Sequence, residues 1–183
     1  MNASDRFDKY RADFPARAPD LTRKDADDEL EDLSSSPEVM SLSVASSNDT
    51  TTIQHCNVLE EDSDGFWLTT KTLKGKYLWL VRPDDVKIAL EHGQLRRSEK
   101  NGPLKHTNLT AGEAHSGGEL WFENDTAIYV NGGSGRFKPR SGDELQAVVA
   151  GFQSAGYTVC SFGWDYGSNK EKRFLRRENI IWI

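Results

Sequence analysis

Long hydrophobic runs are missing from this 183-residue chain. No apolar stretch approaches the roughly 20 residues that a membrane-spanning helix needs, so the sequence predicts no membrane partner. The first residues, MNASDRFDKYRADFPAR, also lack the apolar core of a secretory signal peptide. We therefore expect a soluble protein that is cytoplasmic, or is delivered into a target cell by a route without a classical signal peptide.

Cysteine and histidine are scarce. The chain has two cysteines, Cys56 and Cys160, and four histidines, with no Cys-x-x-Cys or His-x-x-x-His spacing. A structural zinc site would lack ligands at a suitable spacing, so no metal and no other cofactor is expected. Without a secretory signal the thiols are expected to stay reduced, with Cys160 in the core.

Charge is distributed unevenly along the chain. Residues 1–64 carry 16 acidic and 6 basic residues, a balance of −10, whereas residues 65–183 carry 13 acidic and 17 basic residues, a balance of +4. Residues 1–50 also contain few large apolar side chains. Such a stretch buries too little apolar area to offset its conformational entropy, which predicts a disordered acidic segment over 1–50 and a linker over 51–64.

Three roles are open for the acidic segment. It is a solvating tail, a docking arm for a protein partner, or a mask over the mildly basic remainder of the chain. Because the remainder is only weakly positive, nucleic acid is left open as a partner. The basic residues of 170–173 and 176–177 are interpreted as an exposed charged edge or as a nucleic-acid contact.

Residues 65–183 contain all five tryptophans and form the predicted domain. Its expected elements are a buried strand over 77–81, a helix over 83–93, a hairpin over 118–123 and 127–131, a helix over 142–155 and a strand over 158–162. The closing stretch 174–183 is expected to hold a final strand through Ile180, Ile181 and Trp182. Ser141 and Glu144 form a capping box for the second helix. The fold class is α+β, a mainly antiparallel sheet with two helices packed on it.

One polar segment lies where a hydrophobic pattern would be expected. It contains Lys105, His106, Thr107 and Asn108. In an extended conformation His106 and Asn108 point to the same face, because side chains alternate along a strand. The alternative is that His106 is a structural histidine, hydrogen-bonded between a loop and a strand.

A second segment, residues 131–139, is rich in glycine and follows the hairpin. Gly132, Gly133 and Gly135 permit backbone conformations with positive φ and close approach of a ligand, and successive amides can bind an anion. Ser134 lies in the same loop, and Arg136 would add a fork for a phosphate or carboxylate. The alternative is a plain turn.

Glu119 is the third candidate. As a carboxylate near both segments it could orient His106, but its alternation with neighbouring strand residues is equally typical of a solvent-facing position.

An ordered set of motifs suggests a family. Residues 104–109 (LKHTNL), 118–120 (GEL) and 134–139 (SGRFKP) are followed by the amphipathic helix. Over about residues 77–160 the chain resembles a domain found in plant IQ-motif calmodulin-binding proteins and in bacterial toxin-like and effector-like C-terminal domains, with the pattern His-Ser-x-Leu, Ala-Gly-Glu, Ser-Gly-His-Tyr-x-Pro. Here Thr107 replaces the serine, and Arg136 and Phe137 replace the His-Tyr pair. No IQ motif is present, so calmodulin binding is not implied.

Three functions remain open. The first is a binding module whose pocket recognises a small phosphate-bearing ligand or a protein partner through Lys105, Asn108, Gly133, Ser134, Gly135 and Arg136. The second is an effector-type or toxin-type, metal-independent enzyme acting on RNA or a nucleotide. Its catalytic residues would be His106 as general acid or base, Glu119 to orient it and Arg136 to stabilise charge. The third is a purely structural role, in which His106 and the turn around Ser134 hold the hairpin to the preceding loop.

Overall fold

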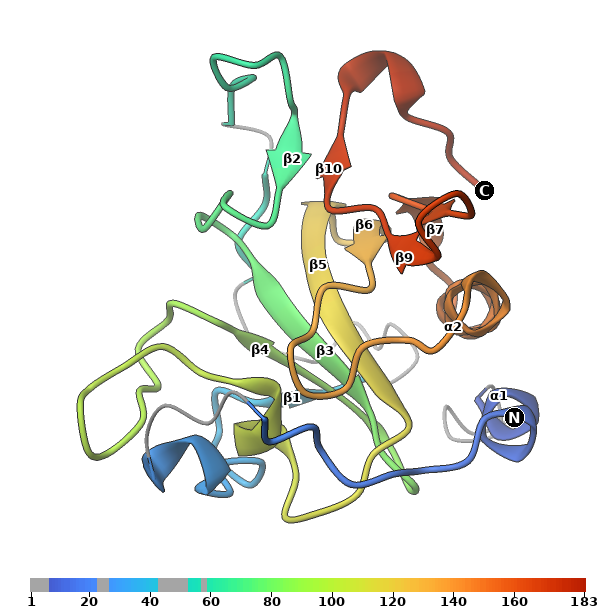
Figure 1. Cartoon of the computed structure of the whole chain (residues 1–183). Helices are drawn as coiled ribbons and strands as arrows, with labels where there is room; N and C mark the ends of the chain where they lie inside the picture. Colours follow the sequence, from blue (N-terminus) through green and yellow to red (C-terminus); the bar gives the residue numbers. More distant parts are fainter. Residues whose placement is uncertain (1–6, 23–26, 43–52, 57–58) are drawn as a thin grey trace.

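A six-stranded sheet forms the centre of the protein (Figure 1). The computed structural model describes residues 7–22, 27–42, 53–56 and 59–183. The strand order is β1-β4-β3-β5-β6-β7, and every neighbouring pair is antiparallel except β6 and β7. In that order the strands are Met40–Ser41, Val86–Leu90, Tyr77–Val81, Ser116–Asn124, Ala127–Asn131 and Thr158–Ser161. The α+β class is confirmed, and so are the predicted strands over 77–81 and 158–162 and the hairpin.

Helix α2 (Gly142–Ser154) carries the chain from β6 to its parallel neighbour β7. The Ser141 side chain accepts a hydrogen bond from the backbone N–H of Glu144 at 3.1 Å, which satisfies a free donor at the helix start. Leu145, Val148 and Phe152 are buried against the sheet. The helix predicted over 142–155 is confirmed, because this apolar stripe matches the crossover that parallel strands require.

A short helix, α1 (Asp8–Asp13), packs beside α2. Phe7 is fully buried and Tyr10 nearly so, and the Phe7 ring meets that of Phe152 edge-on with centroids 5.6 Å apart. The predicted disorder is therefore wrong for residues 7–22, since their aromatic side chains complete the main core. Residues 1–6, 23–26 and 43–50 of that segment lie outside the described residues.

No helix among the residues that the structure describes is both long enough and apolar enough to cross a membrane.

The sheet face opposite α1 and α2 has its own apolar cluster. Leu78 and Leu80 of β3 pack there against Leu104, Leu109 and Phe137. Leu33 and Val39 extend the same cluster, so residues 27–42 run across this face before β1 pairs with β4 as the edge strand of the sheet. The predicted disorder is thus also wrong for 27–42. The two polar segments identified from the sequence lie on this second face.

The predicted helix over 83–93 is wrong. Residues 82–85 form a tight turn, in which the Arg82 backbone N–H donates to the Asp85 carbonyl at 2.8 Å and the two side chains form an ion pair. Val86–Leu90 then forms strand β4 between β1 and β3. Val86 and Ile88 alternate into the main core with a period of two, which the sheet environment favours for β-branched residues.

The C-terminal part is less regular than predicted. Two short antiparallel strand pairs stand outside the main sheet, namely β2 (Leu68–Thr69) with β10 (Phe174–Leu175) and β8 (Trp164–Asp165) with β9 (Lys170–Glu171). After β10 the chain forms the 3-10 helix η4 (Arg177–Asn179) instead of continuing as a strand. At the open edge of β7, Ile183 exchanges two backbone hydrogen bonds with Val159.

Candidate functional site

A pocket of about 230 Å³ lies on the second face of the sheet. Six residues singled out from the sequence line it: Lys105, His106, Glu119, Gly133, Gly135 and Arg136. Four further lining residues were not singled out, namely Glu29, Leu78, Glu91 and Leu104. The structure therefore brings the two polar segments and Glu119 together around one cavity.

Two predicted binding residues do not line this pocket. The Asn108 side chain accepts from the Lys105 backbone N–H at 2.8 Å and donates to the carbonyl of Glu31 at 2.8 Å. The Ser134 hydroxyl accepts from the backbone N–H groups of Arg136 and Phe137, at 3.3 and 2.9 Å. Both side chains shape the backbone that surrounds the pocket.

The segment carrying His106 is not extended. His106–Leu109 forms a 3-10 helix, η3, so the prediction that His106 and Asn108 share one face is wrong. Asn108 causes part of this change, because its bond to the Lys105 N–H closes a local turn. The turn sends His106 toward β5 and leaves Asn108 facing residues 29–31.

His106 is buried against the backbone of β5. Its Nε2 lies 2.9 Å from the carbonyl oxygen of Gly118, and since a carbonyl only accepts, Nε2 carries the proton and Nδ1 keeps its lone pair. Burial lowers the pKa of His106 to about 4, against the opposing effect of that hydrogen bond. The imidazole is therefore neutral near neutral pH.

The close approach of His106 depends on glycine in β5. A Cβ on Gly117 would lie 2.7 Å from His106 Cδ2, and one on Gly118 would lie 2.7 Å from the Trp79 ring and collide with the carbonyl oxygen of Asn131. Because Gly118 has no side chain, the Trp79 ring can approach β5 closely, and its indole N–H donates to the carbonyls of Glu119 and Asn131, at 3.2 and 3.1 Å.

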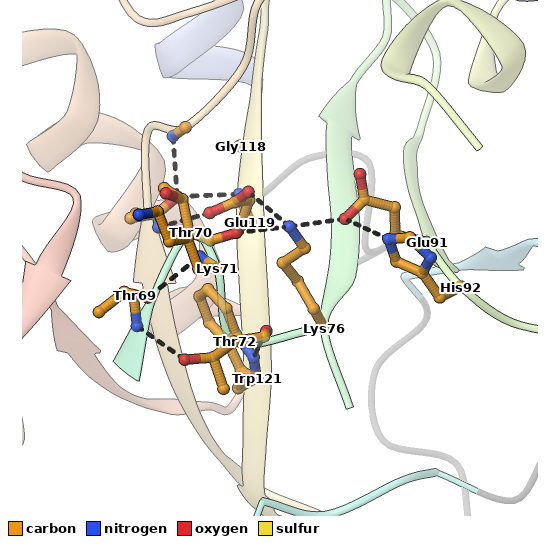
Figure 2. Close-up of polar contacts among 12 residues, drawn as sticks. Thr69, Thr70, Lys71, Thr72, Lys76, Glu91, His92, Gly118, Glu119 and Trp121 are labelled. Atoms are coloured by element: carbon orange, nitrogen blue, oxygen red, sulfur yellow. Dashed lines mark hydrogen bonds and ion pairs between the residues drawn. The ribbon is translucent and has the colours of Figure 1, made fainter. Parts of the chain in front are cut away.

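A buried lysine joins two of the pocket carboxylates (Figure 2). Lys76 Nζ lies 3.0 Å from Glu119 Oε1 and 2.6 Å from Glu91 Oε2, and it also donates to the carbonyl of Thr70 at 2.9 Å. Burial opposes the charged form of Lys76, but Glu119 and Glu91 outweigh it and raise the lysine pKa. Lys76 therefore stays charged beneath the pocket.

Glu119 is buried and not solvent-facing, which corrects the alternative interpretation of its strand. Its Oε2 accepts from the Asn131 side-chain amide at 2.9 Å. Burial raises the pKa of the Glu119 carboxyl, and Lys76 and Asn131 offset only part of that effect. On strand β3, Leu78 pairs with Glu119 in the register, so an apolar side chain and a carboxylate lie side by side on the same sheet face and both line the pocket.

The glycine-rich loop is held by Asn131. Its side-chain oxygen accepts from the backbone N–H groups of Glu119, at 3.1 Å, and Gly133, at 2.8 Å. None of Gly132, Gly133 and Gly135 has a positive φ, so that expectation is wrong. Gly133 is instead required by space, because a Cβ there would lie 2.9 Å from Asn131 Oδ1 and 3.0 Å from Glu119 Oε2.

Arg136 is already engaged by a carboxylate. Its guanidinium forms a buried ion pair with Glu29, which belongs to the 3-10 helix η2 (Asp27–Leu30). Arg97 Nη1 lies 3.7 Å from the other oxygen of the same carboxylate. The acidic segment thus contributes one wall of the pocket.

Sequence reasoning missed Glu29, Glu91 and Lys76. Glu29 lies in an acidic run that is typical of a solvated tail, and Lys76 and Glu91 flank strands as ordinary surface charges do. The sequence did contain one signal, the charge balance of −10 over residues 1–64 against +4 over residues 65–183. It suggested that the acidic segment covers a basic surface, but it did not indicate which acidic residue does so. Within the described ranges, no group of three or more His, Cys, Asp or Glu residues is placed to hold a metal ion.

Comparison with protein-family models, with curated proteins and with solved structures finds no match to this chain. The resemblance to the plant and bacterial domain stays a prediction.

Proposed function

We propose that this protein is a binding module whose pocket takes the anionic group of a small ligand, a phosphate or a carboxylate. The observation that carries the proposal is the Arg136 guanidinium, which lines the pocket and already holds a carboxylate, that of Glu29. Guanidinium groups bind carboxylate and phosphate oxygens through the same paired N–H geometry. A ligand anion at Arg136 would replace the Glu29 carboxylate.

Lys105 supports an anionic ligand independently. Its side chain lines the pocket, and its ammonium makes no hydrogen bond or ion pair with the described part of the chain. The other lysine, Lys76, is neutralised by Glu119 and Glu91. Among the described residues that line the pocket, Lys105 is therefore a cation available to a second oxygen of the ligand.

The size of the cavity limits what can enter. Pockets for drug-sized ligands have volumes of roughly 300–1,000 Å³, so about 230 Å³ suits a head group more than a complete nucleotide. His106 and Glu119 line the same pocket, and the lone pair of the imidazole and the carboxylate oxygens are acceptors for hydroxyl or amine groups. A compact phosphate ester or carboxylate with hydrogen-bond donors fits this set.

Thermal shift and calorimetric titration test the proposal. The probes are inorganic phosphate, ribose 5-phosphate and glutarate, each added to the full chain and to Arg136→Gln. At least one should raise the melting temperature of the wild type and lose at least tenfold in affinity in Arg136→Gln. The matched control is Arg173→Gln, since Arg173 also pairs with a buried carboxylate, that of Glu171, but lies outside the pocket. Equal responses of the wild type and Arg136→Gln to all three probes would refute it.

The alternative function is a metal-independent enzyme acting on RNA or a nucleotide with His106 as general acid or base. His106, Glu119 and Arg136 lining one pocket supports it. One observation opposes an enzymatic function: with a pKa of about 4, almost no His106 imidazole is protonated near neutral pH, so the residue is poorly suited to act as a general acid. Nδ1 could still accept a proton. Loss of RNA or nucleotide turnover in His106→Ala, with the fold retained, would favour the enzyme.

A further inference from the structure

Residues 27–33 of the acidic segment contact the pocket rim in two chemically different ways. The first is through a side chain. The Glu29 carboxylate is buried between the guanidinium groups of Arg136 and Arg97, both of which are themselves largely buried. A carboxylate held by two arginines is a recognition contact that any peptide carrying a glutamate in register could reproduce.

The second is through the main chain. Asn108 Nδ2 donates to the carbonyls of Glu31, at 2.8 Å, and Glu29, at 3.3 Å, and the Thr107 hydroxyl also donates to the Glu29 carbonyl. In return the Leu33 N–H donates to the Asn108 carbonyl at 2.8 Å. Main-chain hydrogen bonds with a side-chain anchor at a fixed position are the features of peptide docking sites.

Polar contacts dominate over residues 29–31. Leu30 is 41% exposed, and the Glu31 carboxylate accepts hydrogen bonds from the backbone N–H and the hydroxyl of Ser98 on an exposed loop. By contrast, Phe7 and Tyr10 secure α1 through buried rings. Within residues 27–33, Leu33 is partly buried against the apolar cluster of this sheet face. A competing segment that supplies an apolar side chain there can replace the stretch at small cost to the core.

We propose that the groove formed by η3, Arg97 and Arg136 is a docking site for an acidic peptide segment of a partner protein, and that residues 27–33 occupy it in cis as a competitor. This rests on the proposed function, since Arg136 is the anion site in both. Charge complementarity favours an acidic partner, because Lys105 lines the same pocket as Arg136 and adds a second cation to it, whereas the carboxylate of Glu29 is paired with Arg136. In this proposal, residues 27–33 occupy the docking site until an acidic segment of the partner displaces them.

The experiment uses the full chain and a fluorescein-labelled peptide with the sequence of residues 25–36, followed by fluorescence anisotropy. Wild type should bind it weakly, because a tethered competitor acts at an effective concentration of the order of millimolar. Glu29→Gln removes the tethered anchor and should bind the peptide about tenfold more tightly. A peptide with Gln in place of its Glu29 equivalent should lose that gain, as should the double variant Glu29→Gln/Arg136→Gln. Glu38→Gln, at an exposed position of the same segment, should match the wild type.

Retention of the fold is checked by circular dichroism, and Glu29→Asp serves as a second variant that keeps the charge while shortening the reach to Arg136. Equal peptide affinity in wild type, Glu29→Gln and Glu29→Asp would overturn the inference, as would binding that ignores the Gln-substituted peptide. If phosphate or glutarate binds in an Arg136-dependent way but the peptide does not, the proposed function stands and the inference fails. If none of these probes binds, both fail.

Discussion

Arg136 and Glu29 are 107 residues apart in the sequence, yet their side chains form a buried ion pair at the wall of the pocket. The pair connects the acidic front of the chain to the glycine-rich loop after β6. It follows that Glu29 of the acidic segment takes part in the site and that the chemistry of the pocket cannot be assessed from residues 65–183 alone.

Replacing Lys76 with Met is expected to lower the free energy of unfolding by about 3–5 kcal/mol, because it leaves the Glu119 and Glu91 carboxylates buried without a cation. Urea denaturation measures the loss. The exposed Lys71→Met should change stability by less than about 0.5 kcal/mol. Burial raises the pKa of Glu119, so without Lys76 the carboxyl is expected to take up a proton as the pH falls and to lose its buried charge. The loss of unfolding free energy in Lys76→Met should therefore become smaller between about pH 8 and about pH 5. A variant as stable as the wild type at both pH values would contradict this.

His106 should make stability depend on pH. Its pKa is lowered from 6.5 to about 4, so between these values the unfolded chain binds a proton that the folded protein does not. The contribution of the neutral, buried imidazole to the free energy of unfolding is therefore fully present above about pH 6.5. It is lost as the pH drops toward 4, by up to about 3 kcal/mol. Unfolding free energies across this range should show a shallower slope in His106→Gln. Leu104→Ala, a destabilising change without a titrating group, should keep the wild-type slope, and a His106→Gln slope equal to it would refute the assignment.

Two glycines of the site should respond differently to alanine. In Gly118→Ala the new Cβ would meet the Trp79 ring and the Asn131 carbonyl, so we expect a loss of about 1–3 kcal/mol or more. In Gly135→Ala nothing lies within 4 Å of the new atom, so the melting temperature should stay close to that of the wild type. Thermal unfolding of both variants tests the contrast. Similar melting temperatures would show that β5 accommodates the methyl group.

Much of the fold could be predicted because its pattern is local. The stripe of α2 and the alternation of the β5–β6 hairpin are each set by residues within a few positions of one another. The failures share a different cause. Val86–Leu90 matches both a helical and a strand period, and pairing with β3 and β1 selects the strand. Phe7 and Tyr10 are too few to predict a core, yet they are buried because the domain supplies the other side.

The candidate site was predictable in its main members and not in its electrostatics. His106 and Arg136 stood out because polar residues interrupt apolar patterns there, Glu119 was a candidate as a carboxylate that could orient His106, and all three line the pocket. That Glu119 is buried, that Lys76 neutralises it and that Arg136 is taken by Glu29 depend on contacts between segments far apart in the chain.

By itself the sequence determined the strands and helix with clear periodicity, the scarcity of metal ligands and the uneven distribution of charge. Only the tertiary structure decided which charges are neighbours, which are removed from water and which tautomer His106 adopts. The reason is physical: periodicity acts between residues close along the chain, whereas desolvation and ion pairing depend on distances that arise only when the sheet and its covering segments assemble.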